Sequence, residues 1–230
     1  MTATTATGVA IEVADQHRVS GLLTMPMQAR ACCVLAHGAG AGMRHPFMAA
    51  VATGFSQRGI ATLRYQFPYM ERGSRRPDAP ALAHATVRAA VATAARLAPG
   101  LLLVAGGKSF GGRMTSQAQA LAPLASVRGL VFLGFPLHPA GKPSTDRARH
   151  LFDVRIPMLF LQGTRDALAE LSLLAPLVDS LGTRATLKLL EGADHSFHVA
   201  GRGARPDDAV RGEMLDALAV WFAGLPAAEA

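Results

Sequence analysis

The chain has 230 residues, half of them hydrophobic, and a formal net charge of +7. This length fits one large domain, so we expect residues 1–230 to form a single unit. The arginines that supply the charge are scattered without a basic cluster or zinc-finger spacing, which argues against a nucleic-acid partner.

The sequence shows neither a membrane span nor an export signal. Its longest apolar runs have strand length, far short of the ~20 residues that a membrane-spanning helix needs. The first seven residues lack the basic and apolar parts of a secretory signal. We therefore expect a cytoplasmic protein with no membrane partner, acting as a monomer or a homodimer.

Short and nearly continuous apolar runs predict strands of a sheet that is covered on both faces. A front pair at residues 8–13 and 19–25 is expected to be antiparallel, with a tight turn near Asp15, Gln16 and His17. Six further strands are predicted at residues 31–36, 60–65, 101–105, 130–134, 158–162 and 185–190. Helical periodicity fills the gaps at residues 46–58, 80–97, 110–121, 168–181 and 207–222. This alternation predicts an α/β fold with a mostly parallel, doubly wound sheet and helices on both faces.

Cys32 and Cys33 are adjacent within the predicted strand 31–36. Successive residues of a strand point to opposite faces, and a disulfide between neighbours would be strained. We expect two buried free thiols.

The most informative motif is Gly107-Lys108-Ser109-Phe110-Gly111, between the apolar run 101–105 and a predicted helix. A strand followed by G-x-S-x-G and a helix is the sequence form of a nucleophile elbow, whose strained turn leaves no room for a Cβ at the glycines. Ser109 could instead cap the helix, but glycine at both fixed positions favours a nucleophile. We expect Lys108 to lie exposed beside the serine, without a role.

A serine nucleophile needs a base to take its proton and an acid to orient that base. In parallel sheets such groups gather at the carboxyl ends of strands, and two later strands run into Asp166 and His195. The chain order Ser109, Asp166, His195 is the order expected of a nucleophile elbow. Asp194 is the rival to Asp166, which could also cap a helix, and His198 is the fallback base.

Two backbone N–H groups are expected to stabilise the oxyanion. One belongs to Phe110, at the amino end of the helix behind the serine. The other is assigned to Ala39 in the small-residue loop after strand 31–36, where His37 shapes the loop. His195, His198 and Asp166 could be read as metal ligands, but a third histidine or a nearby cysteine is missing. We expect no metal and no cofactor.

Six segments of the chain carry a resemblance to a known family. They are His37-Gly38-Ala39-Gly40, Arg64-Tyr65-Gln66-Phe67-Pro68-Tyr69, Gly107-Lys108-Ser109-Phe110-Gly111-Gly112, Gly134-Phe135-Pro136-Leu137-His138, Gln162-Gly163-Thr164-Arg165-Asp166 and Asp194-His195-Ser196-Phe197. With these segments the chain resembles the α/β-hydrolase superfamily, in its small, lidless, dienelactone-hydrolase-like branch, and in particular the group that includes testis-expressed protein 30. The resemblance implies acyl-transfer chemistry, and residues 135–156 are too few for the cap domain found in many members.

We expect a serine hydrolase that cleaves an ester, thioester or lactone of a small to medium acyl group through an acyl-enzyme on Ser109. A loop cluster of Arg72, Arg75 and Arg76 could recognise an anion, although a solvated loop is the simpler interpretation. Two alternatives stay open: a non-catalytic interaction module on a retained hydrolase fold, and an acyltransferase or perhydrolase with the same three residues. Substrate contacts are expected from His37, Gly38, Tyr69, Arg72 and His138.

Overall fold

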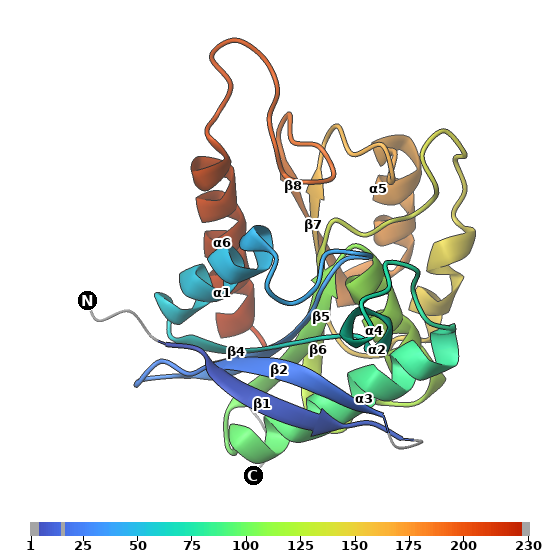
Figure 1. The fold of residues 1–230 in the computed structure, drawn as a ribbon. Coiled ribbons are helices and arrows are strands. Elements are labelled where there is room, and N and C mark those ends of the chain that lie inside the picture. Colours follow the sequence, from blue (N-terminus) through green and yellow to red (C-terminus); the bar gives the residue numbers. More distant parts are fainter. Residues whose placement is uncertain (1–4, 15–16, 227–230) are drawn as a thin grey trace.

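A sheet of eight strands forms the centre of the computed structural model, which describes residues 5–14 and 17–226 (Figure 1). The strands are β1 (Thr7–Glu12), β2 (Arg18–Thr24), β3 (Ala31–Ala36), β4 (Ile60–Tyr65), β5 (Leu102–Lys108), β6 (Val127–Leu133), β7 (Met158–Gly163) and β8 (Ala185–Leu190). Their order is β1-β2-β4-β3-β5-β6-β7-β8. The pairs β1–β2 and β2–β4 are antiparallel, and all other neighbours are parallel. The mostly parallel sheet is confirmed, whereas the turn expected at Asp15 and Gln16 lies outside the described residues.

Helices cover both faces of this sheet, as predicted (Figure 1). On one face, α1 (Pro46–Ser56) and α6 (Asp207–Ala223) pack on each other and on the sheet. On the other lie α3 (Pro80–Leu97), α4 (Phe110–Leu121) and α5 (Leu171–Ser180). Cys32 belongs to the core beneath the second group and Cys33 to the core beneath the first, and both thiols are free and buried.

Three short helices were not predicted: α2 (Pro68–Glu71) and the 3₁₀ helices η1 (Asp146–Asp153) and η2 (Gly182–Arg184). Each is too short to show a hydrophobic period. The predicted helix start at residue 168 is wrong, because residues 166–169 form a turn and α5 begins at Leu171. None of the described helices combines the length and the apolar character needed to cross a bilayer.

Strand β5 is longer than predicted because it includes Gly106 and Gly107. A Cβ on Gly106 would lie 2.0 Å from the carbonyl oxygen of Val131 on β6, and one on Gly107 would lie 2.3 Å from that of Ala36 on β3. The glycines therefore let β5 run between its two neighbours up to the residue before Ser109.

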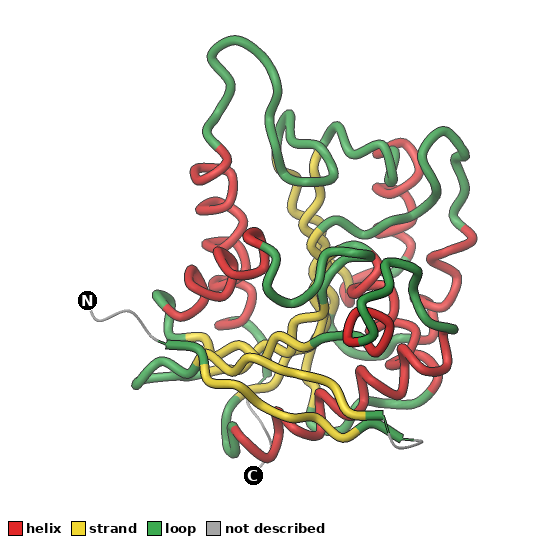
Figure 2. The backbone as a smooth tube through the Cα atoms, in the orientation of Figure 1, coloured by secondary structure: helices red, strands yellow, loops and turns green. Residues whose placement is uncertain are grey.

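The loops that follow β6, β7 and β8 extend on the same side of the sheet (Figure 2). This follows from parallel strands, whose carboxyl ends share one edge. Residues 134–157, between β6 and β7, hold only loops and η1, so no cap domain is inserted there.

Candidate active site

Ser109 stands on a sharp turn between β5 and α4, with φ of 50° and ψ of −117°. A positive φ strains a residue that carries a side chain, so the surroundings must hold it in place. A Cβ on Gly111 would lie 2.6 Å from the carbonyl oxygen of His37. Together with the contact at Gly107, this packing explains why both fixed positions of the motif are glycine.

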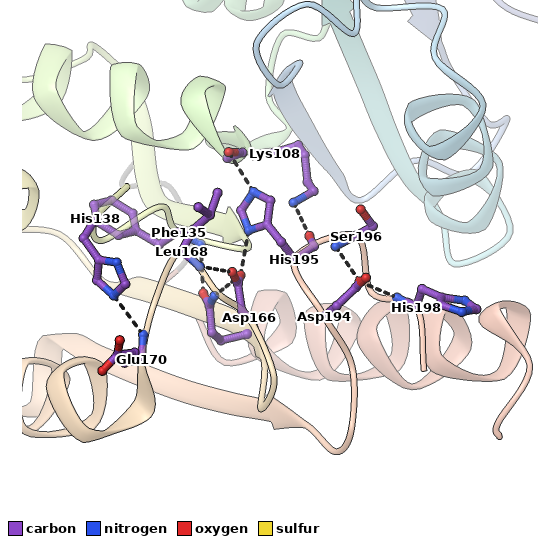
Figure 3. A network of polar contacts seen from close by, with 12 residues as sticks. Lys108, Phe135, His138, Asp166, Leu168, Glu170, Asp194, His195, Ser196 and His198 are labelled. Atoms are coloured by element: carbon purple, nitrogen blue, oxygen red, sulfur yellow. Dashed lines mark hydrogen bonds and ion pairs between the residues drawn. The ribbon is translucent and has the colours of Figure 1, made fainter. Parts of the chain in front are cut away.

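The structure brings Ser109, His195 and Asp166 together in one chain of hydrogen bonds. Figure 3 shows His195 pointing towards Asp166. Nε2 of His195 lies 2.9 Å from Oγ of Ser109, and Nδ1 lies 2.6 Å from Oδ2 of Asp166. The Asp166 side chain is fully buried, and 24% of the His195 side chain is exposed. The base can thus reach a substrate while the acid is shielded from water.

Asp166 is held by two further donors. Nε2 of Gln162 donates to Oδ2 at 2.5 Å, and the backbone N–H of Leu168 donates to Oδ1 at 2.8 Å. The amide oxygen of Gln162 accepts the N–H of Phe135 at 2.8 Å, which fixes the orientation of the amide. These bonds leave Asp166 as the acceptor for Nδ1–H of His195, so Nε2 is free to accept the serine proton. The sequence signal for Gln162 is a polar residue at the end of an otherwise apolar strand.

The two rivals are occupied elsewhere. Oδ1 of Asp194 accepts the N–H groups of Ser196 and His198 at 2.7 and 3.0 Å, so this side chain caps its own turn. The exposed His198 pairs with Asp207 on α6, with 2.8 Å between Nδ1 and Oδ1. Neither contact involves Ser109.

The two expected oxyanion donors lie beside the serine. Ala39 lines the same pocket as Ser109, and Phe110 is the first residue of α4. The first N–H groups of a helix have no partner within it and carry its positive dipole end. In the described part of the chain, the backbone N–H groups of Ala39 and Phe110 have no acceptor.

A pocket of about 320 Å³ opens at Ser109. The expected contact Gly38 lines it, and His45 lies at its edge. Sequence reasoning missed the apolar side of the pocket, which is formed by Phe47, Met48 and Leu168. These residues come from segments without a recognisable motif. The lining residues are Gly38, Ala39, Ala41, His45, Phe47, Met48, Lys108, Ser109, Leu168, His195 and Ser196.

His37 and Tyr69 do not line this pocket, and both are buried. Nε2 of His37 accepts the N–H of Phe67 at 3.2 Å, and Nδ1 lies 2.7 Å from the carbonyl oxygen of Gly38. Burial lowers the pKa of His37 to about 4, which keeps the ring neutral. The hydroxyl of Tyr69 accepts the N–H of Gly40 at 3.2 Å. Both side chains hold the loop that carries Ala39, and direct substrate contacts from them stay predictions.

Arg72 and His138 are also not among the residues that line the pocket. The guanidinium of Arg72 pairs with Asp78, which in turn accepts the N–H of Tyr69 at 2.8 Å. His138 is fully buried, and its Nε2 accepts the N–H of Glu170 at 3.1 Å (Figure 3). Each of these two side chains has a partner that orients it, and substrate contacts from them stay predictions.

The sequence suggested that Lys108 is exposed and has no role. The structure differs, because Lys108 is only partly exposed and makes a defined hydrogen bond. Its side chain lines the pocket, and Nζ donates to the carbonyl oxygen of His195 at 2.5 Å (Figure 3). The same atom lies 5.2 Å from the centre of the Phe197 ring, within the range of a cation–π contact. Burial lowers the pKa of this lysine to about 8.

Among the described residues, no group of three or more His, Cys, Asp or Glu side chains could hold a metal.

Comparison with solved structures gives matches over nearly the whole chain. A dienelactone hydrolase from Anabaena variabilis superposes with a TM-score of 0.77 at 20% identity, covering 97% of this chain and 99% of that one. A serine hydrolase without a lid from Xanthomonas campestris gives 0.75 at 18% identity, covering 100% and 99%. An esterase domain from Rhodothermus marinus gives 0.73 at 16% identity, covering 96% and 98%.

These likenesses show a shared fold, and the narrower resemblance to the testis-expressed protein 30 group stays a prediction. Independently of them, residues 29–223 match the α/β hydrolase domain family. The fold, the strand order and this match lead to one conclusion: the chain belongs to the α/β hydrolase domain family.

Proposed function

We propose that this protein is a serine hydrolase that cleaves an ester, thioester or lactone of a small to medium acyl group. The observation that carries the proposal is the continuous chain of hydrogen bonds from Ser109 through His195 to Asp166. Membership of the α/β hydrolase family supports a hydrolase. The esterase and dienelactone hydrolase of the same fold suggest esters and lactones as substrates.

In the proposed reaction, Oγ of Ser109 attacks the substrate carbonyl while Nε2 of His195 takes the hydroxyl proton. Asp166 stabilises the imidazolium that forms, and the N–H groups of Ala39 and Phe110 stabilise the oxyanion. His195 then gives its proton to the leaving group, which leaves an acyl-enzyme on Ser109. Water attacks this intermediate with His195 again as the base, and the acid product is released. No metal and no cofactor takes part in this scheme.

The pocket supports the size limit on the acyl group. A volume of about 320 Å³ lies at the lower end of the roughly 300–1,000 Å³ that is typical of small-molecule sites. Phe47, Met48 and Leu168 offer an apolar wall to the acyl chain. A cytoplasmic location, a monomeric or homodimeric state and the absence of nucleic-acid and membrane partners stay predictions.

Labelling with a fluorophosphonate probe, together with hydrolysis of p-nitrophenyl esters from acetate to octanoate, tests the proposal. We expect Ser109→Ala to abolish labelling and to lower kcat by about a thousandfold or more. Ser172→Ala, at an exposed position on α5, is the matched control and should keep both activities.

Three results would contradict the proposal. Undiminished labelling of Ser109→Ala would show that another residue is the nucleophile. If the wild type neither reacts with the probe nor hydrolyses any of the esters, the interaction module becomes the better interpretation. Turnover that requires an added alcohol, thiol or peroxide would instead identify an acyltransferase or perhydrolase.

A further inference from the structure

Lys108, the residue before the proposed nucleophile, is a positively charged residue in the lining of the pocket. It is the last residue of β5, and its side chain lines the pocket together with Ser109 and His195. One donor of the ammonium is used by the carbonyl oxygen of His195 at 2.5 Å. With a pKa of about 8, the ammonium is mostly charged at neutral pH.

This charge has no carboxylate of its own. In residues 5–14 and 17–226, no ion pair to Nζ of Lys108 is formed. Asp166 and Asp194 lie near enough to favour the charged form, but both oxygens of Asp166 and Oδ1 of Asp194 accept hydrogen bonds from other groups. By contrast, Lys188 on β8 pairs with Glu213 at 2.6 Å.

The surrounding backbone leaves space for the ammonium at this place. Gly134, directly after β6, has a φ of 72°, and a Cβ there would lie 2.9 Å from Nζ of Lys108. On the other side, the Phe197 ring stacks on Phe47 of the pocket wall, with 5.7 Å between ring centres. Lys108 therefore occupies a defined position between Gly134 and an aromatic pair.

A shielded cation without a counterion is costly, and Lys108 lines the cavity that opens at Ser109. We propose that Lys108 binds a carboxylate on the substrate, so that the preferred substrates of this hydrolase are anionic esters. The inference rests on the proposed hydrolase function and narrows its substrate class. It also assigns anion recognition to the residue before the nucleophile. The sequence had offered the Arg72 loop as an alternative place for it.

Matched pairs of esters test this assignment. Monoethyl esters of the C4 to C6 dicarboxylic acids are compared with ethyl esters of the monocarboxylic acids of equal length, which places the charge on the acyl side. 4-Acetoxybutanoate is compared with butyl acetate, which places it on the alcohol side. Ethanol or acetate release gives kcat/KM for each ester, and the ratio of anionic to neutral ester is the measured quantity.

We expect a ratio above one in the wild type for at least one pair, and the side of the ester on which it occurs locates the carboxylate. In Lys108→Met this ratio should fall by about tenfold or more, the effect of losing a hydrogen bond to a charged group. Lys142→Met, on an exposed loop, is the matched control and should keep the wild-type ratio. Because a ratio is measured, a displacement of His195 that slows both esters equally cancels.

Three outcomes would overturn the inference. A wild-type ratio below one for every pair would show that the pocket does not favour anions. An unchanged ratio in Lys108→Met, with both rates lowered, would show that Lys108 only holds the His195 loop. Either result leaves the proposed hydrolase intact if Ser109 is still labelled by the fluorophosphonate. Absence of both labelling and turnover would refute the hydrolase and this inference with it.

Discussion

The side chain of Gln66 holds the backbone of Met43, whose N–H it accepts at 2.8 Å. Arg64, two residues earlier on β4, donates from Nη1 to the carbonyl oxygen of Met43 at 3.2 Å. Met43 lies in the loop between β3 and α1 that also carries Ala39. Arg64 on β4 and Gln66 just after it thus hold the N–H and the carbonyl oxygen of Met43. They thereby support the loop that carries Ala39, the proposed oxyanion donor.

Gln66→Leu removes half of this support and leaves a buried N–H unpaired. We expect a loss of about 1–3 kcal/mol in the free energy of unfolding and a lower kcat, because the loop with Ala39 is less well held. Urea unfolding and p-nitrophenyl ester kinetics measure the two effects. Gln57→Leu, at an exposed position after α1, should change neither. A normal kcat in a destabilised Gln66→Leu would show that the loop needs no such support.

Gln162→Leu tests the support of the acid. The variant loses a hydrogen bond to the Asp166 carboxylate, an interaction worth about 1.5–3 kcal/mol, so we expect kcat to fall by about 10–100-fold. KM should change little, since Gln162 is buried and does not line the pocket. Steady-state kinetics separate the two constants. Gln162→Glu should lose more, because it places a second carboxylate against the first; equal activity in both variants would contradict this.

Gly163→Ala tests the contact between the Asp166 and His195 loops. A Cβ at position 163 would lie 2.2 Å from the carbonyl oxygen of Ala193 and 2.6 Å from that of Asp194. We expect a destabilisation of about 1–3 kcal/mol from overpacking, with a loss of activity as the two loops move apart. Gly212→Ala is the control, because a Cβ within α6 would meet open space. In that variant, the free energy of unfolding, measured by thermal unfolding, should rise by about 1 kcal/mol. A decrease would contradict the packing of α6.

Acid should destabilise the fold through His37. Its pKa is about 4 in the folded protein against 6.5 for an unperturbed histidine, so the unfolded chain binds a proton that the folded chain does not. Stability is therefore complete above pH 6.5 and falls as the pH drops towards 4, by about 3 kcal/mol for this residue. His150, whose pKa burial also lowers to about 4, contributes in the same direction.

Urea unfolding at pH 7.5 and pH 4.5 measures this difference. In His37→Gln, the amide oxygen can still accept the N–H of Phe67 but takes up no proton. We expect a smaller pH dependence than in the wild type, whereas His17→Gln should keep the full difference. Equal pH dependence in His37→Gln and the wild type would show that His37 is not the residue responsible.

The sequence predicted the parts of this molecule that depend on local chemistry. Short, nearly continuous apolar runs indicated the sheet, and the strand-to-helix glycine motif indicated the turn at Ser109. Asp166 and His195 could be found because parallel strands end at one edge, where their following residues meet. All three residues lie together in the structure.

The sequence could not reveal the contacts of His138 and Lys108, because their partners are far away in the sequence. His138 accepts the backbone N–H of Glu170, 32 residues later in the chain. Lys108 bends towards a carbonyl oxygen 87 residues later. No local pattern encodes such contacts, because they depend on how the loops meet once the sheet has formed.

The neighbouring thiols of Cys32 and Cys33 offer a further use, because the sheet separates them. Burial raises the pKa of Cys32 to about 12 and that of Cys33 well above its usual range, so neither reacts as a thiolate until its surroundings open. Labelling Cys32 would report loosening of the α3 and α4 side, and labelling Cys33 would report loosening of the α1 and α6 side. Two thiols on consecutive residues thus allow the opening of each helical layer to be timed separately in one protein.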